Sequence, residues 1–164
     1  MCIRIIITGG TFDKDYDAIK GELTFKNTHL PAILEQARVT IPVELEINQL
    51  TDSLHMTAAQ RRRILTACRA APEERVIIVH GTDTMVETAR LLGEAGLGKT
   101  IVLTGAMIPY AVTGSDSLFN LGCSVGAAQL LPPGVYVAMN GRLFPWDNVR
   151  KERQEGIFKP KRGT

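Results

Sequence analysis

The feature that most limits the fold of this chain is a set of short segments rich in Ile, Val and Leu. Each is apolar throughout rather than alternating in polarity, which is typical of strands buried on both faces of a parallel sheet. Longer segments with helical spacing separate them. The five predicted strands are Ile3–Thr8, Val43–Asn48, Arg75–His80, Thr100–Thr104 and Gly134–Met139.

The intervening segments favour helices. Thr57–Ala70 is the clearest, with Thr57 as its expected N-cap and Pro72 just beyond its end. The other expected helices are Thr28–Gln36, Asp83–Glu94 and Ser115–Leu131. Alternating strands and helices predict an α/β fold: a three-layer, open, mainly parallel sheet with helices on both faces, flavodoxin- or Rossmann-like. At 164 residues, with no repeat or linker, we expect one domain over 1–164, ending in a solvated tail at about 152–164.

The composition argues against several classes of protein. The net charge is only +2, and no long basic tract could follow a phosphate backbone, so we expect no nucleic-acid partner. No apolar run approaches the roughly 20 residues needed to cross a bilayer, so we expect no membrane association. The N-terminal segment lacks a signal-peptide core and a cleavage site. These observations favour a cytoplasmic protein.

The cysteines and histidines predict neither disulfides nor a metal site. Three cysteines lack CxxC or Cys/His spacing, which favours reduced thiols. The three histidines are scattered and have no HExxH pattern beside them. We therefore expect no metal and no cofactor.

Two other motifs are set aside. Gly93–Thr100 matches the phosphate-binding pattern GxxxxGK[ST], but it ends a predicted helix and begins a strand, the reverse of a phosphate loop. We expect a helix C-cap and a loop there. Thr113–Ser117 lacks the Gly-x-Ser-x-Gly pattern of serine hydrolases, and no Gly-x-Gly-x-x-Gly follows the first strand.

Polar residues and glycines follow four of the predicted strands. The segments are Thr8–Thr11, Thr51–Ser53, His80–Thr84 and Thr104–Met107. In open parallel sheets ligands bind beyond the carboxyl ends of the strands, so these segments could share one polar pocket. The same residue types also make ordinary turns and helix caps, and Thr82 or Asp83 could simply cap the helix that follows. The residues alone leave both interpretations open.

A pocket of this kind would suit nucleophilic chemistry. A threonine hydroxyl attacks only when a base takes its proton, and a second threonine with Asp and Lys could relay that proton. Lys151 is a candidate for the lysine, although its sequence context alone favours a surface cation.

The segments at the strand ends also resemble a known family. Ile7–Thr11 together with His80–Ala89 is similar to the paired signature of bacterial L-asparaginases and related glutaminase-asparaginases. Val102–Pro109 and Asp116–Asn120 resemble a further segment of the same family, and the likeness runs in order over essentially the whole chain.

The resemblance implies roles for five residues. It places the primary nucleophile at Thr11, an assisting hydroxyl and a carboxylate at Thr82 and Asp83, and the lysine of the relay at Lys151. A mobile tyrosine that follows the nucleophile in the family corresponds to Tyr16. On this basis Lys151 is a catalytic residue rather than a surface cation.

The resemblance also implies a substrate and a reaction. Asp52 and Ser53 would hold the α-amino and α-carboxylate groups, with Gly81 and Ala106 beside the substrate. The implied activity is hydrolysis of L-asparagine to L-aspartate and ammonia by a homo-oligomer. Family members are about twice as long, so the chain resembles a short, single-domain branch without the C-terminal domain. An amino-acid-binding module, or the amidase component of a larger assembly acting on another amide, are the alternatives.

Overall fold

Six strands form the central sheet in the computed structural model, which describes residues 1–163. The strand order is β4-β1-β5-β6-β7-β8; the first five are parallel, and β8 is antiparallel to β7. The strands are β1 (Ile3–Gly9), β4 (Val43–Thr51), β5 (Arg75–Val79), β6 (Thr100–Thr104), β7 (Gly134–Met139) and β8 (Arg142–Pro145). All five predicted strands are confirmed, with ends that differ by at most three residues.

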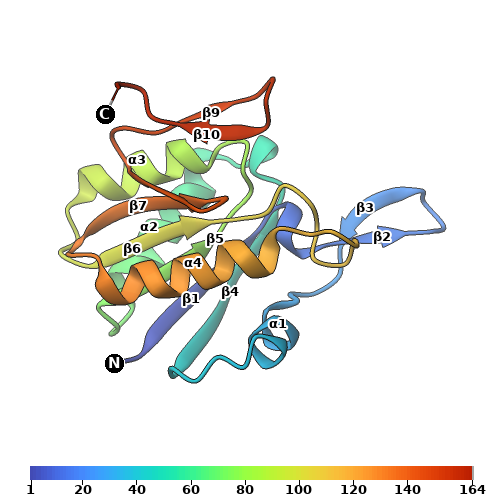
Figure 1. Cartoon of the computed structure of the whole chain (residues 1–164), viewed down its shortest axis with the longest axis horizontal. Helices are drawn as coiled ribbons and strands as arrows, with labels where there is room; N and C mark the ends of the chain where they lie inside the picture. The colour runs from blue at the N-terminus through green and yellow to red at the C-terminus, as the bar shows by residue number, and fades with distance from the viewer. Residues whose placement is uncertain (164) are drawn as a thin grey trace.

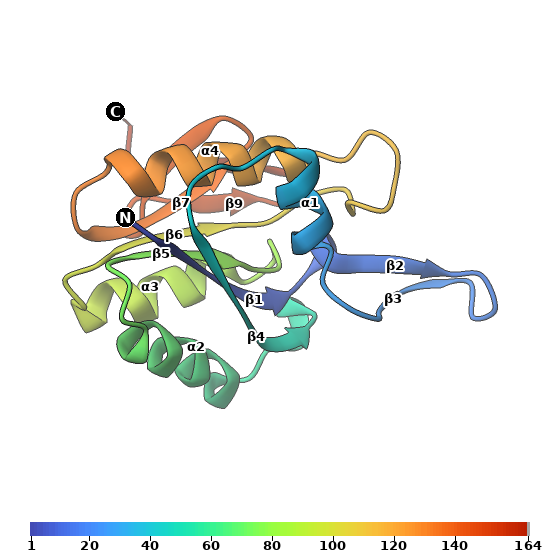
Figure 2. The same ribbon diagram turned by 90° about the horizontal axis from the view of Figure 1, so that it is seen from below.

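Four helices cover the two faces of this sheet (Figures 1 and 2). The helices α1 (Leu30–Gln36) and α4 (Ser117–Leu130) lie on one face. The helices α2 (Ala58–Ala70) and α3 (Met85–Ala95) lie on the other. The predicted three-layer α/β architecture is confirmed. Thr57 caps α2 as expected, and its hydroxyl accepts a hydrogen bond from the Gln60 amide at 3.2 Å.

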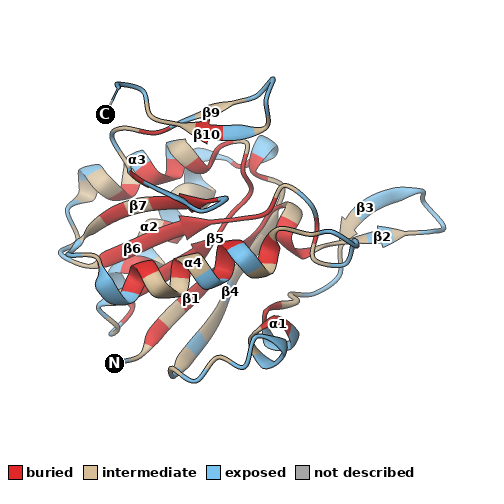
Figure 3. Ribbon diagram, viewed as in Figure 1, coloured by how far each residue is buried: buried red, intermediate tan, exposed pale blue. Residues whose placement is uncertain are grey.

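The strands are apolar throughout because both faces of the sheet are buried. In β1, Ile5 and Ile7 contribute to the core under α1 and α4, whereas Ile6 contributes to the core under α2 and α3. The same alternation continues through β5 and β6, so the buried strands run through the middle of the molecule (Figure 3). Burial of this kind provides most of the favourable free energy of folding.

The direction in which successive strands join the sheet changes between β1 and β5. The chain leaves β1 toward α1 on one face, whereas it leaves β5 toward α3 on the other face. At such a switch point the connections diverge, and the carboxyl ends of the two strands are left open to a ligand. The residues that follow β1 and β5 are therefore the first candidates for a functional site.

Two hairpins were not predicted from the sequence. The first, β2 (Lys14–Asp17) with β3 (Glu22–Phe25), extends away from the body of the domain (Figures 1 and 2). The second, β9 (Arg150–Glu152) with β10 (Ile157–Lys159), lies over α3. The expected solvated tail is wrong for this segment, because Phe158 is buried in the core that contains α2 and α3.

The segment that matches a phosphate-binding loop is a helix end, as expected. Gly96 caps α3 in the left-handed conformation, with φ at 56°, and the amine of Lys99 donates to the carbonyls of Ala71 and Glu73. Among residues 1–163 no helix is long and apolar enough to cross a membrane. Within the same residues no cluster of His, Cys, Asp and Glu side chains could hold a metal ion.

Candidate active site

The turns that follow β1, β4 and β5 are in direct backbone contact. Gly10 adopts φ 81°, and a Cβ atom added to it would lie 2.4 Å from Cα of Gly81. A Cβ atom on Gly81 would in turn lie 2.4 Å from Oγ of Ser53. Only glycine allows contact this close. Thr11 and Thr82, each one residue beyond these glycines, therefore start from neighbouring turns at the switch point.

Lys151 connects Thr82 to Asp83. Its amine donates to Oγ1 of Thr82 at 2.8 Å and to Oδ1 of Asp83 at 2.9 Å. Thr82 is buried, and the Lys151 side chain is 12% exposed, so the contact is largely shielded from water. The alternative in which Thr82 or Asp83 caps the helix is wrong, because the N-cap of α3 is Thr84. The structure thus brings three of the five expected catalytic side chains together.

The β9–β10 hairpin carries Lys151 to this position. Lys151 and Phe158 are cross-strand partners, so their side chains leave the hairpin on the same face. Phe158 fixes the hairpin in the core, and Lys151 reaches the start of α3 beside it. The first residue after β9, Arg153, also contacts Asp83: one guanidinium nitrogen lies 3.4 Å from Oδ1, and the other donates to the backbone carbonyl at 3.1 Å.

Thr11 itself lies in a short 3-10 turn, Thr11–Asp13, directly after β1, and it is partly exposed. The following residue, Phe12, is fully buried and holds this turn against the core. Asp13 accepts a hydrogen bond from the backbone amide of His29 at 2.8 Å. Burial raises the pKa of the Asp13 carboxyl, against the lowering effect of this bond. Phe12 and Asp13 therefore fix the turn that carries Thr11 to the rest of the domain, and Thr11 lies on the accessible side of this turn.

A buried histidine supports the turn after β5. His80 is fully buried; its Nδ1 lies 2.8 Å from the Gly81 carbonyl, and its Nε2 lies 2.8 Å from the Thr88 hydroxyl. A carbonyl can only accept, so Nδ1 carries the proton and Nε2 accepts from Thr88. Burial lowers the pKa of His80 to about 4, and the charge of Arg61 adds to this effect, so the ring is neutral at pH 7. Sequence reasoning gave His80 no role.

The turn after β4 brings Ser53 to the same place. The hydroxyl of Ser53 accepts a hydrogen bond from the Thr84 amide at 3.4 Å, and its carbonyl accepts from the Thr84 hydroxyl at 2.7 Å. Asp52 points to Lys14 instead, with 2.5 Å between the charged atoms. Partial burial raises the pKa of Asp52, but Lys14, the Leu54 amide and the charge of His55 together outweigh it, and the pKa lies below its usual value. Ser53 thus faces the switch point, whereas the Asp52 carboxylate is already paired.

The turn after β6 is held by Asp116. Its carboxylate accepts from the Met107 amide at 3.0 Å, the Ile108 amide at 3.0 Å and the Asn140 side chain at 2.9 Å. Partial burial raises the pKa of Asp116, but these donors outweigh it and the pKa lies below its usual value. Ala106, expected beside the substrate, is 1% exposed and its methyl group packs into the core, so only its backbone could face a ligand.

Tyr16 stands apart from the other expected residues. It lies in β2, opposite Leu23 of β3, and its side chain is 61% exposed. The hairpin places it on a projecting arm beyond the carboxyl end of β1 (Figure 2). No contact in the structure joins Tyr16 to the Lys151 network among residues 1–163.

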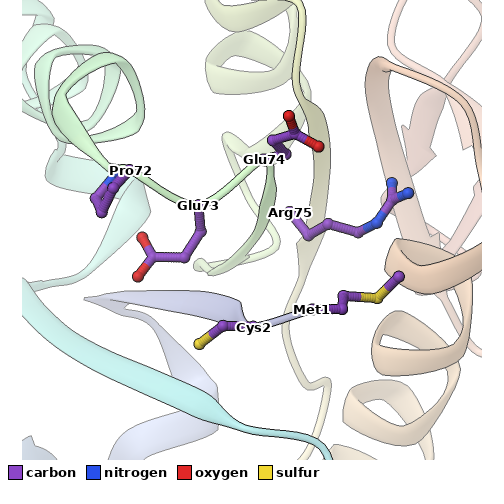
Figure 4. A pocket seen from close by; sticks show the side chains of 6 residues that line it. All are labelled: Met1, Cys2, Pro72, Glu73, Glu74 and Arg75. Atoms are coloured by element: carbon purple, nitrogen blue, oxygen red, sulfur yellow. The ribbon is translucent and has the colours of Figure 1, made fainter.

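A hollow of about 400 Å³ lies at the opposite edge of the sheet (Figure 4). It opens between the amino ends of β1 and β5, where Glu73 pairs with Arg4 at 2.7 Å. Ligands in open α/β sheets bind at the carboxyl ends, so this hollow has no part in the candidate site. Its lining residues are Met1, Cys2, Pro72, Glu73, Glu74 and Arg75.

Comparison with known proteins agrees with the geometry. Residues 2–157 match the family described as "Asparaginase, N-terminal". The chain belongs to the asparaginase family. A solved L-asparaginase of Thermococcus kodakarensis superimposes with a TM-score of 0.86 at 25% identity, over 98% of this chain and 51% of that one.

Two curated relatives show the range of this family. L-asparaginase 1 of Escherichia coli strain K12 is 29% identical over 94% of this chain and 48% of the relative. The human 60 kDa lysophospholipase is 32% identical over 74% of this chain and 22% of the relative. The chain therefore spans about half, or less, of the length of these relatives.

Proposed function

We propose that this asparaginase-family domain hydrolyses L-asparagine to L-aspartate and ammonia, with Thr11 as the nucleophile. The observation that carries the proposal is the pair of hydrogen bonds from the Lys151 amine to the Thr82 hydroxyl and the Asp83 carboxylate. A surface cation would not be held between a buried hydroxyl and a carboxylate. A hydroxyl, an amine and a carboxylate in sequence form a route for a proton.

In the proposed reaction the Thr11 hydroxyl attacks the side-chain amide carbon of L-asparagine. Thr82, Lys151 and Asp83 take up the proton and deliver it to the departing nitrogen, which leaves as ammonia. The bond between the amide carbon and nitrogen breaks, which leaves the aspartyl group joined to Thr11 as an ester. One water molecule then hydrolyses this ester: its hydroxyl completes the carboxyl group of L-aspartate and its proton restores the Thr11 hydroxyl, so one water is consumed for each ammonia released. Neither step requires a metal or a cofactor.

The negative charge that develops on the amide oxygen needs backbone donors. The amide of Gly10 donates to the Thr51 carbonyl at 3.1 Å, so it is already engaged. We therefore assign the oxyanion to the backbone of Gly81–Thr82, the turn that His80 supports from below. Ser53, beside the same turn, is assigned to the α-groups of the substrate.

Ammonia release from L-asparagine tests the nucleophile. Thr11→Ala should lower kcat by at least about a thousandfold, since loss of a nucleophile removes the covalent route. Thr40→Ala, at an exposed threonine before β4, is the matched control and should keep full activity. Equal activity in wild type and Thr11→Ala would refute the assignment. A folded wild-type protein that binds L-asparagine without releasing ammonia would support the binding module instead.

We further propose that the protein acts in the cytoplasm as a homo-oligomer. Cys2, Cys68 and Cys123 are all free thiols, as a reducing compartment favours. The Asp83 side chain is 35% exposed, which leaves room for a neighbouring subunit to cover the site. Light scattering should give a mass of at least twice the 17.9 kDa of one chain. A fully active monomer would contradict the oligomer.

A further inference from the structure

The outer side of α4 is apolar and open to water. The helix carries no charged side chain over its 14 residues, whereas α2, of similar length, carries four arginines. Its two largest outward side chains, Phe119 and Leu130, are 59% and 87% exposed. In Figure 1 α4 lies in front of the sheet and no part of residues 1–163 passes over it, and Figure 3 shows exposed positions along it. A helix surface of this kind is typical of a protein interface.

The edge strand β8 extends this surface. Leu143 is 48% exposed and lies beside α4. Arg142, the one charged residue of β8, belongs to the other side of the sheet, where its guanidinium lies 5.0 Å from the ring of Phe144 in the core under α2 and α3. A hollow of about 360 Å³ separates the helix from β8, and its lining includes Cys123 and Gly126. The α4 face, made of Phe119, Cys123, Gly126, Leu130 and Leu143, thus combines projecting apolar side chains with an apolar recess.

The outward residues of α4 have the spacing of a helix–helix contact. Four of them are separated by four, three and four positions: Phe119, Cys123, Gly126 and Leu130. This is the repeat of a coiled-coil seam, and it reads the same in both directions along the helix. When two copies of α4 lie antiparallel, Phe119 is therefore opposite Leu130 of the partner subunit. At the centre Gly122 and Gly126 have no atom within 4 Å of an added Cβ, so the two helices can approach closely.

We propose that the α4 face binds a second copy of this chain about a two-fold axis, with the two α4 helices antiparallel. Because the side chains of α4 carry no charge, the helix dipole is its main electrostatic feature. An antiparallel pair places the positive end of each dipole beside the negative end of the other, so the face is complementary to itself. A highly charged partner would find no opposite charge here. The proposal rests on the proposed homo-oligomer and adds the surface that forms it.

The exposed apolar area is close to what a stable dimer needs. A typical interface buries about 800 Å² on each partner, roughly a tenth of the 8129 Å² surface of this chain. About 60% of such an interface is apolar, which corresponds to about 500 Å². At about 150–200 Å² for a fully exposed large side chain, Phe119, Leu130 and Leu143 together expose about 300–400 Å². The small apolar residues between them add to this area, so the α4 face is large enough for a second copy.

The test measures the mass of wild type and of charged variants by sedimentation equilibrium. Phe119→Glu and Leu130→Lys each place an unpaired charge in the contact, so each should raise the dimer dissociation constant at least about a hundredfold. The double variant Phe119→Glu/Leu130→Lys should bind at least about tenfold more tightly than either, because each new carboxylate would face the new amine of the other copy. Ile19→Glu is the matched control, since Ile19 is 98% exposed in the turn between β2 and β3, and it should leave the mass unchanged.

A wild-type protein that stays monomeric at its highest soluble concentration would overturn the proposal, and the α4 face would then belong to a different partner. A dimer that persists in both single variants would also overturn it, because the copies would then meet through another surface. A double variant as weak as the single variants would refute the antiparallel arrangement.

Ammonia release from L-asparagine, measured on the same preparations, separates this proposal from the proposed reaction. A wild-type dimer that dissociates in Phe119→Glu but releases no ammonia would support the interface and refute the reaction. An active wild-type monomer would refute the interface and support the reaction.

Discussion

Replacing His80 by asparagine should remove a loss of stability that wild type undergoes between pH 6.5 and pH 4. In the folded protein burial lowers the pKa of His80 from its ordinary value of 6.5 to about 4. The unfolded chain therefore takes up a proton in this range that the folded chain does not. Stability falls as the pH drops from 6.5 toward 4 and is not recovered below it. The full loss is about 3 kcal/mol, at about 1.4 kcal/mol for each pH unit.

Urea denaturation at a series of pH values measures this effect. Between pH 7.5 and pH 5 the contribution of His80 to the free energy of unfolding should fall by about 2 kcal/mol. The raised pKa of Asp13 acts with the opposite sign, since a folded state that holds a proton more tightly gains stability on acidification. The difference in the free energy of unfolding between wild type and a His80 variant separates the contribution of the histidine from that of the carboxyl groups.

His80→Asn keeps a side-chain donor for the Gly81 carbonyl but cannot be protonated in this range. Thr88→Val is the matched control, because it removes the other partner of the ring and leaves the histidine in place. Both variants should be less stable at pH 7.5, but only His80→Asn should lose the dependence on pH. If wild type and His80→Asn show the same slope from pH 7.5 to 5, the ring is not buried and neutral as described.

Two further predictions concern packing. Phe158→Ala should lower the free energy of unfolding by about 3 kcal/mol, because it empties a buried position under the β9–β10 hairpin. Ile157→Ala, at an exposed neighbour, should lower it by less than about 1 kcal/mol. Similar melting temperatures for the two variants would show that the hairpin is a solvated tail. Gly10→Ala should lower the free energy of unfolding by about 3 kcal/mol or more, since its Cβ would enter the backbone of the turn after β5. Gly21→Ala, also at positive φ but with nothing within 4 Å, should lower it by about 1 kcal/mol. Equal decreases for the two variants in denaturation experiments would contradict the close contact at Gly10.

The sheet and its helices could be predicted because burial on both faces marks a sequence strongly. Ile5, Ile6 and Ile7 must all be apolar when successive side chains enter two separate cores. The turns after the strands could also be predicted as a group, because parallel strands bring their carboxyl ends together. The pattern of residues alone could not decide whether Asp83 caps a helix or meets another side chain.

The two hairpins left much weaker signals. Strand β2 reads Lys-Asp-Tyr-Asp and β9 reads Arg-Lys-Glu, so neither shows the apolar pattern that identifies a strand. In β10 the only indication was the lone aromatic residue Phe158 in a charged segment. The position of Lys151 depends on this hairpin, which is why the local sequence alone favoured a surface cation and the resemblance was needed to assign Lys151 a role.

Arg153 could not be identified from the sequence at all. A charged side chain in a run of charged residues is usually a solvated surface group, and this one is indeed mostly exposed. Arg153 directly follows β9, so its contact with Asp83 depends on the position of the β9–β10 hairpin, which the packing of Phe158 determines. His80 was similarly hidden, because its burial follows from tertiary structure.

The most direct test of the account is ammonia release from L-asparagine by Lys151→Met, with Lys161→Met as the control. Methionine keeps most of the length of the side chain but removes the amine that contacts Thr82 and Asp83. Lys151→Met should fold and its kcat should fall by at least about a thousandfold, whereas the Lys161→Met control should keep its activity. Normal turnover by Lys151→Met would contradict the proton route through Thr82, Lys151 and Asp83, and with it the proposed mechanism.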